Sequence, residues 1–216
     1  MLAIAGKGKK EREKSEGRIL WRPIMPLDAD VYSRDVKDNT ETTLVRAALN
    51  GDADSFGRLC ERHYSAMVAI AYCRLCDRDL AEDAAQEAFF VAFRDISKLK
   101  NANHFGRWLA RISRNIASDM AKARRRNKLI PIENCDSVSN DEDKEDNNVE
   151  VVRRIISELP VKIREVIYLR YYDKMSYQQI SDILGISQEA VNGRLRRAKK
   201  LIAKKLLRKG SVEVKL

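Results

Sequence analysis

Residues 176–200 read SYQQISDILGISQEAVNGRLRRAKK, and this stretch predicts two short helices joined by a tight turn. Ser176 followed three positions later by Gln179 forms a capping box, which predicts that a helix begins there. Gly185 supplies the left-handed residue that a tight turn needs, and Ser187 is placed to cap the second helix. Two short helices around a glycine-containing turn of this length have the spacing of a helix-turn-helix.

The second of these helices is strongly basic on the side that its apolar residues leave free. Between Ala190 and Gly210 the chain carries 9 basic residues and no acidic ones, a composition that attracts the phosphates of nucleic acid. We therefore expect this helix to read the major groove of DNA. The alternative is a solvated basic helix in an unrelated bundle. The outward-facing residues are Gln188, Glu189, Asn192, Gly193, Arg196, Arg197 and Lys200.

Charge divides the rest of the chain, which has 216 residues and a formal net charge of +10. Residues 127–148 carry 7 acidic and 2 basic side chains, and they predict a flexible linker because such a segment cannot bury enough apolar surface to become ordered. Residues 1–40 are expected to form a disordered arm. Apolar residues recur at helical spacing in 41–126 and in 149–210. The sequence therefore predicts an all-α protein in which two small helical domains are joined by a flexible acidic linker.

Four helices are expected within residues 41–126, and Asp52, Asp79 and Asn103 are the expected N-caps of the last three. The helix that follows Asp79 has a predicted buried face of alanine and phenylalanine that includes Phe93. Its other face is acidic and polar and would repel phosphate, so it is either a solvated surface or a surface that binds another protein. The residues of this face are Asp83, Gln86, Glu87, Phe90 and Arg94.

The predicted helix FGRWLARISRNIASDMAKARRR, residues 105–126, has a continuous basic flank. Cationic side chains beside a planar ring and amides favour binding of a nucleic-acid strand whose bases are unstacked. The alternative is that the flank is solvated and that the tryptophan belongs to the core. The residues concerned are Arg107, Arg111, Arg114, Lys122 and Arg125 on the flank, with Trp108 beside it and Asn103 and His104 just upstream.

Several functional classes are disfavoured. The chain has no run of about 18 apolar residues and no secretion signal, so neither membrane insertion nor export is expected. No nucleophile–base pair, phosphate-binding loop or zinc-protease pattern is found, so we do not expect an enzyme. A metal site at His63, Cys73 and Cys76 is an alternative, but it lacks a fourth ligand, and no metal or cofactor is expected. Cys60, Cys73, Cys76 and Cys135 are expected to be the reduced thiols of a cytoplasmic protein.

Three motifs in this order resemble bacterial RNA polymerase sigma factors of the small, two-domain, extracytoplasmic-function (ECF) type. They are D-x-x-Q-E at residues 83–87, the basic helix at 105–126, and the helix-turn-helix at 176–200. The resemblance covers residues 41–126 and 149–207. It implies a specificity subunit that binds core RNA polymerase and directs promoter recognition, duplex opening and transcription initiation, while the polymerase performs the chemistry.

The resemblance also implies a role for each surface. The D-x-x-Q-E helix docks on the coiled coil of the polymerase β′ subunit, through Asp83, Gln86, Glu87, Phe90 and Arg94. The loop and helix that follow capture the bases of the minus-ten promoter element, through Asn101, Asn103, His104, Arg107, Trp108, Arg111, Arg114 and Asn115. The helix-turn-helix reads the minus-thirty-five element, through Ser187, Gln188, Glu189, Asn192, Arg196, Arg197 and Lys200, and its domain rests on the β flap.

The sequence departs from the family pattern at positions 192 and 193. Family members often carry Lys-Ser where this chain has Asn192-Gly193. A glycine within a helix costs about 1 kcal/mol relative to alanine, so we expect a close backbone approach or a mild bend there.

Many relatives are held by an anti-sigma factor, which is therefore a further candidate partner. The other hypothesis is a helix-turn-helix repressor or response-regulator effector that never touches polymerase, and it leaves the acidic face and the arginine flank unexplained.

Overall fold

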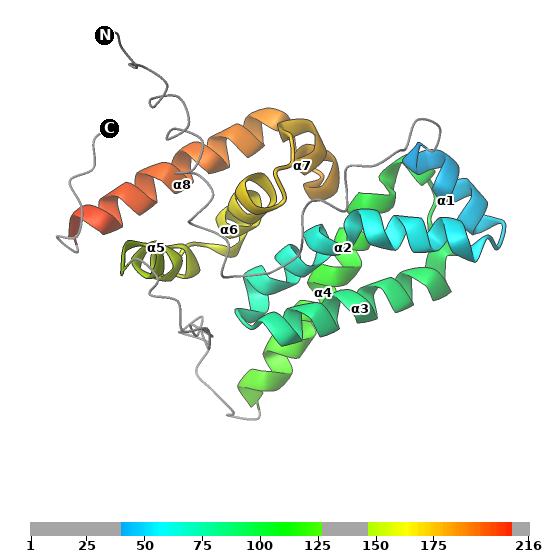
Figure 1. Cartoon of the computed structure of the whole chain (residues 1–216), viewed down its shortest axis with the longest axis horizontal. Coiled ribbons are helices and arrows are strands. Elements are labelled where there is room, and N and C mark those ends of the chain that lie inside the picture. Colours follow the sequence, from blue (N-terminus) through cyan, green and yellow to red (C-terminus); the bar gives the residue numbers. More distant parts are fainter. Residues whose placement is uncertain (1–39, 127–146, 209–216) are drawn as a thin grey trace, which may run out of the picture.

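The computed structural model describes residues 40–126 and 147–208, in which all regular structure is helical (Figure 1). Since these residues contain no strand, the all-α prediction is confirmed. The expected N-terminal arm lies outside the described residues except for Thr40, and the expected acidic linker lies outside them except for its last two positions.

The N-terminal half of the described chain is formed by four α-helices. They are α1 (Glu41–Leu49), α2 (Ala53–Leu75), α3 (Arg78–Asp95) and α4 (Phe105–Arg126), with two 3-10 turns, η3 (Ile96–Lys98) and η4 (Ala102–His104), ahead of α4. The helices α2, α3 and α4 pack against one another, and α1 packs on α2. Small side chains line these contacts and let the helices approach closely. The alanines that are fully buried there include Ala71, Ala81, Ala84, Ala85, Ala110 and Ala117.

Acidic side chains determine where α2 and α3 begin. Asp52 caps α2 as predicted, because its carboxylate accepts a hydrogen bond from the backbone N–H of Asp54 at 3.0 Å. The prediction that Asp79 caps α3 is wrong. The cap is Asp77, whose carboxylate accepts from the N–H of Leu80 at 3.1 Å. The two aspartates are close in sequence and both can cap a helix, so spacing alone did not distinguish them.

The start of α4 also differs from the prediction. Asn103 lies inside η4 and does not cap α4. The capping side chain is that of Asn101, whose Oδ1 accepts from the N–H of Asn103 at 3.0 Å. The chain then continues from η4 into α4 at Phe105, which is fully buried. The asparagine-rich loop and α4 are therefore one continuous unit.

The C-terminal half contains the predicted helix-turn-helix. Its elements are α5 (Asn147–Ser157), α6 (Val161–Ile167), the π-helical segment η5 (Tyr168–Tyr172), α7 (Tyr177–Leu184) and α8 (Gln188–Arg208). The capping box is confirmed, with both the Ser176 and the Gln179 side chains hydrogen-bonded to the backbone. Gly185 has the left-handed conformation (φ 65°), and Ser187 Oγ accepts from the N–H of Ala190 at 3.2 Å. Both turn residues therefore act as predicted.

The two halves of the described chain pack directly against each other, which the sequence did not predict. Their buried apolar residues belong to one continuous core. The ring of Tyr72 in α2 meets that of Tyr168 in η5 edge to face, with centroids 5.5 Å apart. Figure 1 shows α6 and α7 beside α2 and α4. This contact determines which of the candidate functional side chains are exposed.

Candidate functional site

The outer side of α8 is open to solvent. Val191, Leu195 and Ala198 are buried, and their spacing of four and three residues orients the helix so that its polar side faces outward. All seven side chains predicted to bind the minus-thirty-five element are exposed: Ser187, Gln188, Glu189, Asn192, Arg196, Arg197 and Lys200. The surface is free to enter a major groove.

One acidic side chain stands among these basic ones. The pKa of the Glu189 carboxyl is lowered by a backbone hydrogen bond and by a hydrogen bond from Ser187, so the group stays charged at neutral pH. A carboxylate in the major groove repels phosphate but accepts a hydrogen bond from the amino group of cytosine. Glu189 therefore places one negative charge on this otherwise basic surface.

The described part of the structure does not require glycine at position 193. A Cβ added at Gly193 would meet no heavy atom within 4 Å, and α8 continues through this position without a break. A requirement for glycine would therefore arise from a bound partner that approaches the backbone closely, which is one of the two expectations drawn from the sequence.

The loop before α4 is ordered by its own polar groups. Besides the Asn101 cap, Thr42 of α1 donates a hydrogen bond to Asn103 Oδ1 at 2.7 Å. Asn101, Asn103 and His104 are all exposed. These interactions hold the loop and its exposed groups in one arrangement.

The basic flank of α4 is partly covered by the C-terminal half. The Arg107 side chain lies against the turn of the helix-turn-helix, so that a Cβ added at Gly185 would be 2.3 Å from Arg107 Nε. A groove lies between the two, lined by residues of both halves that include His104, Arg107, Asp182 and Ser187. Arg107, Arg111 and Asn115 are nevertheless exposed. Trp108 is half-buried and its ring lies 6.1 Å from that of Phe105.

Arg114 makes an ion pair across the contact between the halves. Its Nε lies 3.0 Å from Oε1 of Glu165 in α6, and only 22% of its side chain is exposed. The same carboxylate oxygen lies 2.7 Å from Nη1 of Arg74 in α2. Sequence reasoning missed both Glu165 and Arg74. The available signal was a glutamate within the apolar run of α6, where a carboxylate needs a cationic partner.

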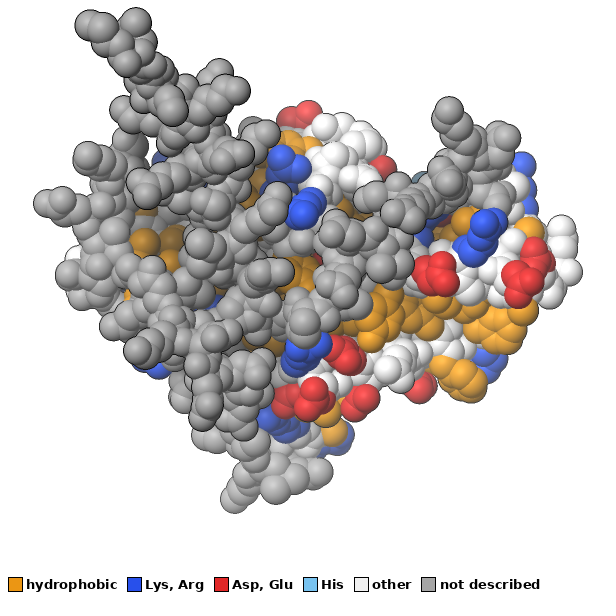
Figure 2. Space-filling model, viewed as in Figure 1, with side chains coloured by type: hydrophobic (Ala, Val, Ile, Leu, Met, Phe, Trp, Pro, Cys, Tyr) orange, Lys and Arg blue, Asp and Glu red, His pale blue; other side chains and the backbone are white. Residues whose placement is uncertain are grey.

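The acidic face of α3 is open. The five side chains predicted to bind core polymerase are exposed: Asp83, Gln86, Glu87, Phe90 and Arg94. Phe90 is 61% exposed, and Phe93 is 54% exposed, which corrects the prediction that Phe93 is buried. One side of the Phe93 ring packs on Phe56, with centroids 5.0 Å apart. Figure 2 shows hydrophobic side chains in a band over α2 and α3, flanked by acidic ones.

The residues of the alternative metal site are engaged elsewhere. His63 Nε2 lies 3.2 Å from Oε2 of Glu41, and the ring packs on Phe105. Cys73 is buried, and burial raises the pKa of its thiol well above the ordinary value. Within residues 40–126 and 147–208, no group of three or more His, Cys, Asp and Glu side chains is arranged to hold a metal ion.

Cys76 corrects one expectation about the cysteines. Cys60 and Cys73 are free thiols, whereas Cys76 is disulfide-bonded. Sequence spacing does not reveal such a bond, because pairing depends on the distance between the two Cα atoms. Among the helices that the structure describes, none combines the length and the apolar character needed to cross a membrane.

Comparison with known families identifies both halves. Residues 59–127 match the family described as Sigma-70 region 2, and residues 150–202 match the family described as Sigma-70, region 4. The first match contains α3 and α4, and the second contains the helix-turn-helix.

Individual relatives agree with these matches. The ECF RNA polymerase sigma-E factor of Escherichia coli is 30% identical over 181 residues, which cover 77% of this chain and 94% of the relative. A probable RNA polymerase sigma factor, RfaY of Xanthomonas campestris, is 31% identical over 171 residues, which cover 75% of this chain but 43% of the relative. The solved structure of CnrH in complex with the cytosolic domain of CnrY covers 78% of this chain and 97% of CnrH at 26% identity, with a TM-score of 0.56. The chain therefore belongs to the ECF family of RNA polymerase sigma factors, and it serves promoter-specific initiation of transcription.

Proposed function

We propose that three surfaces of this sigma factor divide the work of promoter recognition. The face of α3 binds the coiled coil of the polymerase β′ subunit, through Asp83, Gln86, Glu87, Phe90 and Arg94. The loop before α4 and α4 itself bind the minus-ten element, through Asn101, Asn103, His104, Arg107, Trp108, Arg111, Arg114 and Asn115. The outer side of α8 binds the minus-thirty-five element, through Ser187, Gln188, Glu189, Asn192, Arg196, Arg197 and Lys200.

The proposal divides the chain into functional segments. Residues 41–126 form the unit for polymerase and the minus-ten element, and residues 149–210 form the unit for the minus-thirty-five element, which also rests on the β flap. Residues 127–148 connect the two units. The two family matches, of which one ends at residue 127 and the other begins at residue 150, support the division.

The observation that carries the proposal is the contrast in charge between α3 and the other two surfaces. Asp83 and Glu87 are exposed on α3 beside the apolar side chain of Phe90. Carboxylates repel the phosphates of DNA, whereas an acidic surface around an aromatic side chain suits a basic protein partner. The exposed arginines of α4 and α8 have the opposite charge and attract phosphate.

The chain contributes recognition, and the polymerase transfers nucleotides. We therefore assign no catalytic step to this protein, which acts in the cytoplasm together with core polymerase. Duplex opening at the minus-ten element is driven by binding energy, because unstacking costs about a few kcal/mol per step and captured bases and phosphate contacts offset that cost. The exposed loop at Asn101, Asn103 and His104 is placed to receive such bases.

An anti-sigma factor is a further proposed partner. The relative CnrH forms a complex with the cytosolic domain of CnrY, which supports regulation of this chain by a bound protein. The exposed α3 face is a surface on which such a protein could prevent the polymerase from binding.

Run-off transcription tests the proposed function. Purified core polymerase is combined with pooled genomic promoter fragments, with and without this protein. We expect new discrete transcripts that depend on the protein, and their aligned upstream sequences will give the two promoter elements. Duplex binding by the full chain without new transcripts would instead support the repressor hypothesis.

A further inference from the structure

Glu165 is a buried carboxylate with two cationic partners from the other half of the chain. It lies in α6 and is 3% exposed. Arg74 Nη1 lies 2.7 Å from its Oε1, and Arg114 reaches both oxygens, with Nε at 3.0 Å from Oε1 and Nη2 at 3.5 Å from Oε2. Two guanidinium groups from different helices therefore converge on one anion.

This arrangement matches the way proteins bind phosphate. A guanidinium group presents donors in a planar fork that fits phosphate oxygens as well as carboxylate oxygens. Arg74 is also anchored to its own helix, because Nη1 lies 3.3 Å from the carbonyl oxygen of Ile70. The arginine pair thus stays partly organised on the N-terminal half even when Glu165 is removed.

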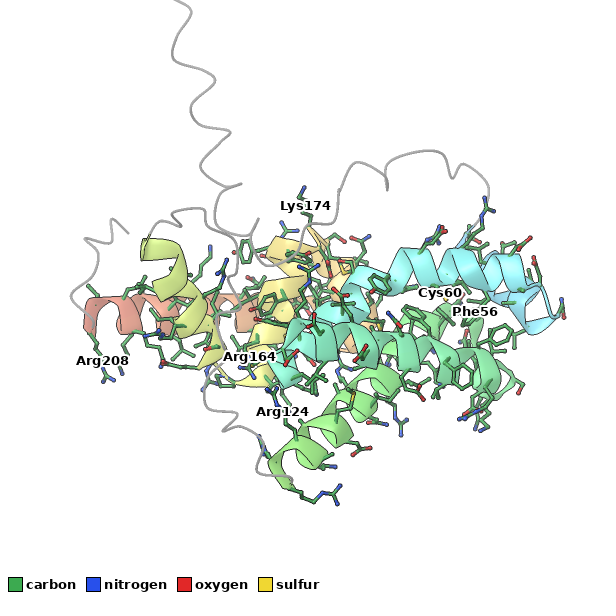
Figure 3. All side chains as sticks on the ribbon, turned by 60° about the horizontal axis from the view of Figure 1, so that its bottom comes forward. Phe56, Cys60, Arg124, Arg164, Lys174 and Arg208 are labelled. Atoms are coloured by element: carbon green, nitrogen blue, oxygen red, sulfur yellow. The ribbon has the colours of Figure 1, made fainter. Side chains whose placement is uncertain are left out.

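The arginine pair continues the basic flank of α4. Arg107, Arg111 and Arg114 are spaced by four and three residues, which places them along one side of the helix. The C-terminal half covers Arg114 through Glu165, whereas Arg107 lies beside the turn at Gly185 and is exposed. Arg164, which precedes Glu165 in the sequence, lies where α6 meets the end of α2 (Figure 3). Its guanidinium Nη2 lies 2.6 Å from the carbonyl oxygen of Cys73 in α2.

The spacing of the two promoter elements requires this contact to open. Their names place them about 25 base pairs apart, which is about 85 Å along B-form DNA. In the structure, α6 and α7 touch α2 and α4 directly. The two halves cannot contact both elements in this arrangement, so promoter binding must remove Glu165 from the two arginines.

We infer that Arg74 and Arg114 form a binding site for a backbone phosphate of promoter DNA, which Glu165 occupies while the two halves are packed together. The inference rests on the proposed function and adds Arg74 to its DNA-binding surface. Glu165 and DNA compete for the same pair of guanidinium groups. When Glu165 leaves the arginine pair, a DNA phosphate takes its place, because two arginines left without an anion would repel each other.

Salt-dependent binding to a short fluorescein-labelled single-stranded oligonucleotide tests the inference with the full chain. Each phosphate contact contributes about 0.7 to the slope of log K against log salt on a single strand. Glu165→Gln removes the competing charge and keeps a similar shape. We expect it to bind more tightly than the unmodified chain, with a slope steeper by about 0.7, which corresponds to one phosphate contact.

A second substitution in the Glu165→Gln background tests whether Arg74 contributes to the phosphate contact. We expect Arg74→Ala to reduce the slope by about 0.7. Arg74→Lys, which keeps the positive charge, should retain most of the slope. The matched control is Arg58→Ala, which removes an exposed arginine from the same helix and should leave the slope unchanged. Circular dichroism of each variant confirms that the helices are intact.

Two results would overturn the inference. One is an equal slope for the Arg74→Ala and Arg58→Ala variants. The other is Glu165→Gln binding that matches the unmodified chain at every salt concentration. If either occurs while the unmodified chain still produces transcripts with core polymerase, the phosphate site is wrong and the proposed function stands. If the chain neither binds the oligonucleotide nor produces transcripts, both are wrong.

Discussion

The faces of α3 and α4 differ in how the packed arrangement presents them. The five side chains of the α3 face are exposed, and Phe90 has 61% of its surface in solvent. On α4, Arg107 is exposed beside the turn of the helix-turn-helix, whereas Arg114 is largely covered and paired with Glu165. The surface assigned to polymerase is therefore ready in this arrangement, whereas the surface assigned to the minus-ten element becomes complete only when the halves separate.

This difference suggests an order of events. Polymerase can bind α3 while the halves remain packed, and DNA can use the whole of α4 only afterwards. Premature DNA binding is limited, because Arg114 of the basic flank is paired with Glu165 within the protein. The predictions that follow test whether the two faces behave as differently as their exposure suggests.

The largest effect is expected for charge reversal on the α3 face. Glu87→Lys places a cation where a basic partner is proposed, and we expect a loss of about 2–5 kcal/mol in binding to core polymerase. Single-stranded DNA binding should not weaken. Binding to surface-immobilised core polymerase measures the affinity for polymerase. Fluorescence anisotropy of a labelled oligonucleotide measures the affinity for single-stranded DNA. The control is Glu61→Lys, which reverses an exposed charge on α2; equal losses for both variants would contradict a docking role for α3.

A somewhat smaller effect is expected for Phe90→Ala. An aromatic side chain at the centre of an interface contributes about 2 kcal/mol or more to binding, so affinity for core polymerase should fall by roughly 30-fold. Thermal stability should barely change because the ring is 61% exposed. A drop in melting temperature with unchanged polymerase affinity would show that Phe90 serves the fold instead.

A pH effect is expected where the halves meet. Burial raises the pKa of the Asp173 carboxyl to about 7, although a hydrogen bond from Ser65 opposes the rise. Burial and the neighbouring Asp173 carboxyl also raise the pKa of Tyr172 to about 12. Because the packed state holds a proton on Asp173 below its raised pKa, packing is most favourable at low pH and weakens as the pH rises through about 7.

The size of the pH effect follows from linkage. The opening equilibrium should increase about 10-fold, which is about 1.4 kcal/mol, between about pH 6 and about pH 8. Small-angle scattering, which reports the radius of gyration, measures the opening. Asp173→Asn should remove most of the pH dependence. If this variant opens with the same pH profile as the unmodified chain, another group controls the contact.

The smallest effect is expected at Gly193. Since a Cβ there meets no heavy atom within 4 Å, Gly193→Ala should stabilise α8 by about 1 kcal/mol. Binding to promoter duplex should weaken if DNA approaches the backbone at this position, as the sequence suggested. Chemical denaturation and duplex binding separate the two effects. Stabilisation with unchanged binding would remove Gly193 from the DNA-binding surface.

Local features were predictable from the sequence because they depend on neighbouring residues. The capping box at Ser176 and Gln179 and the left-handed Gly185 are determined within a few positions of the chain, and all are confirmed. The exposed face of α3 follows from the helical period alone. The burial of Phe93 was predicted on the same basis, but this side chain lies near the end of α3 and is covered on one side only, by Phe56.

The contact between the halves was not predictable. Glu165 lies 51 residues from Arg114 and 91 residues from Arg74 in sequence, and no local pattern connects them. Periodicity shows which face of a helix is apolar but not which other helix will cover a charged residue at its edge. The candidate residues were therefore found largely from local pattern, and their availability only from the packed structure.

A reversible cross-link between the halves tests the central claim most directly. Ser65 and Asp173 are hydrogen-bonded across the contact, so Ser65→Cys with Asp173→Cys places two thiols at the same point, and mass spectrometry confirms the bond. The unmodified chain, treated with and without reductant, is the control for Cys76. We expect the cross-linked protein to bind core polymerase but to give no run-off transcripts until reductant is added. Equal transcript yields from the cross-linked and reduced forms would contradict the claim that the halves must separate to engage a promoter.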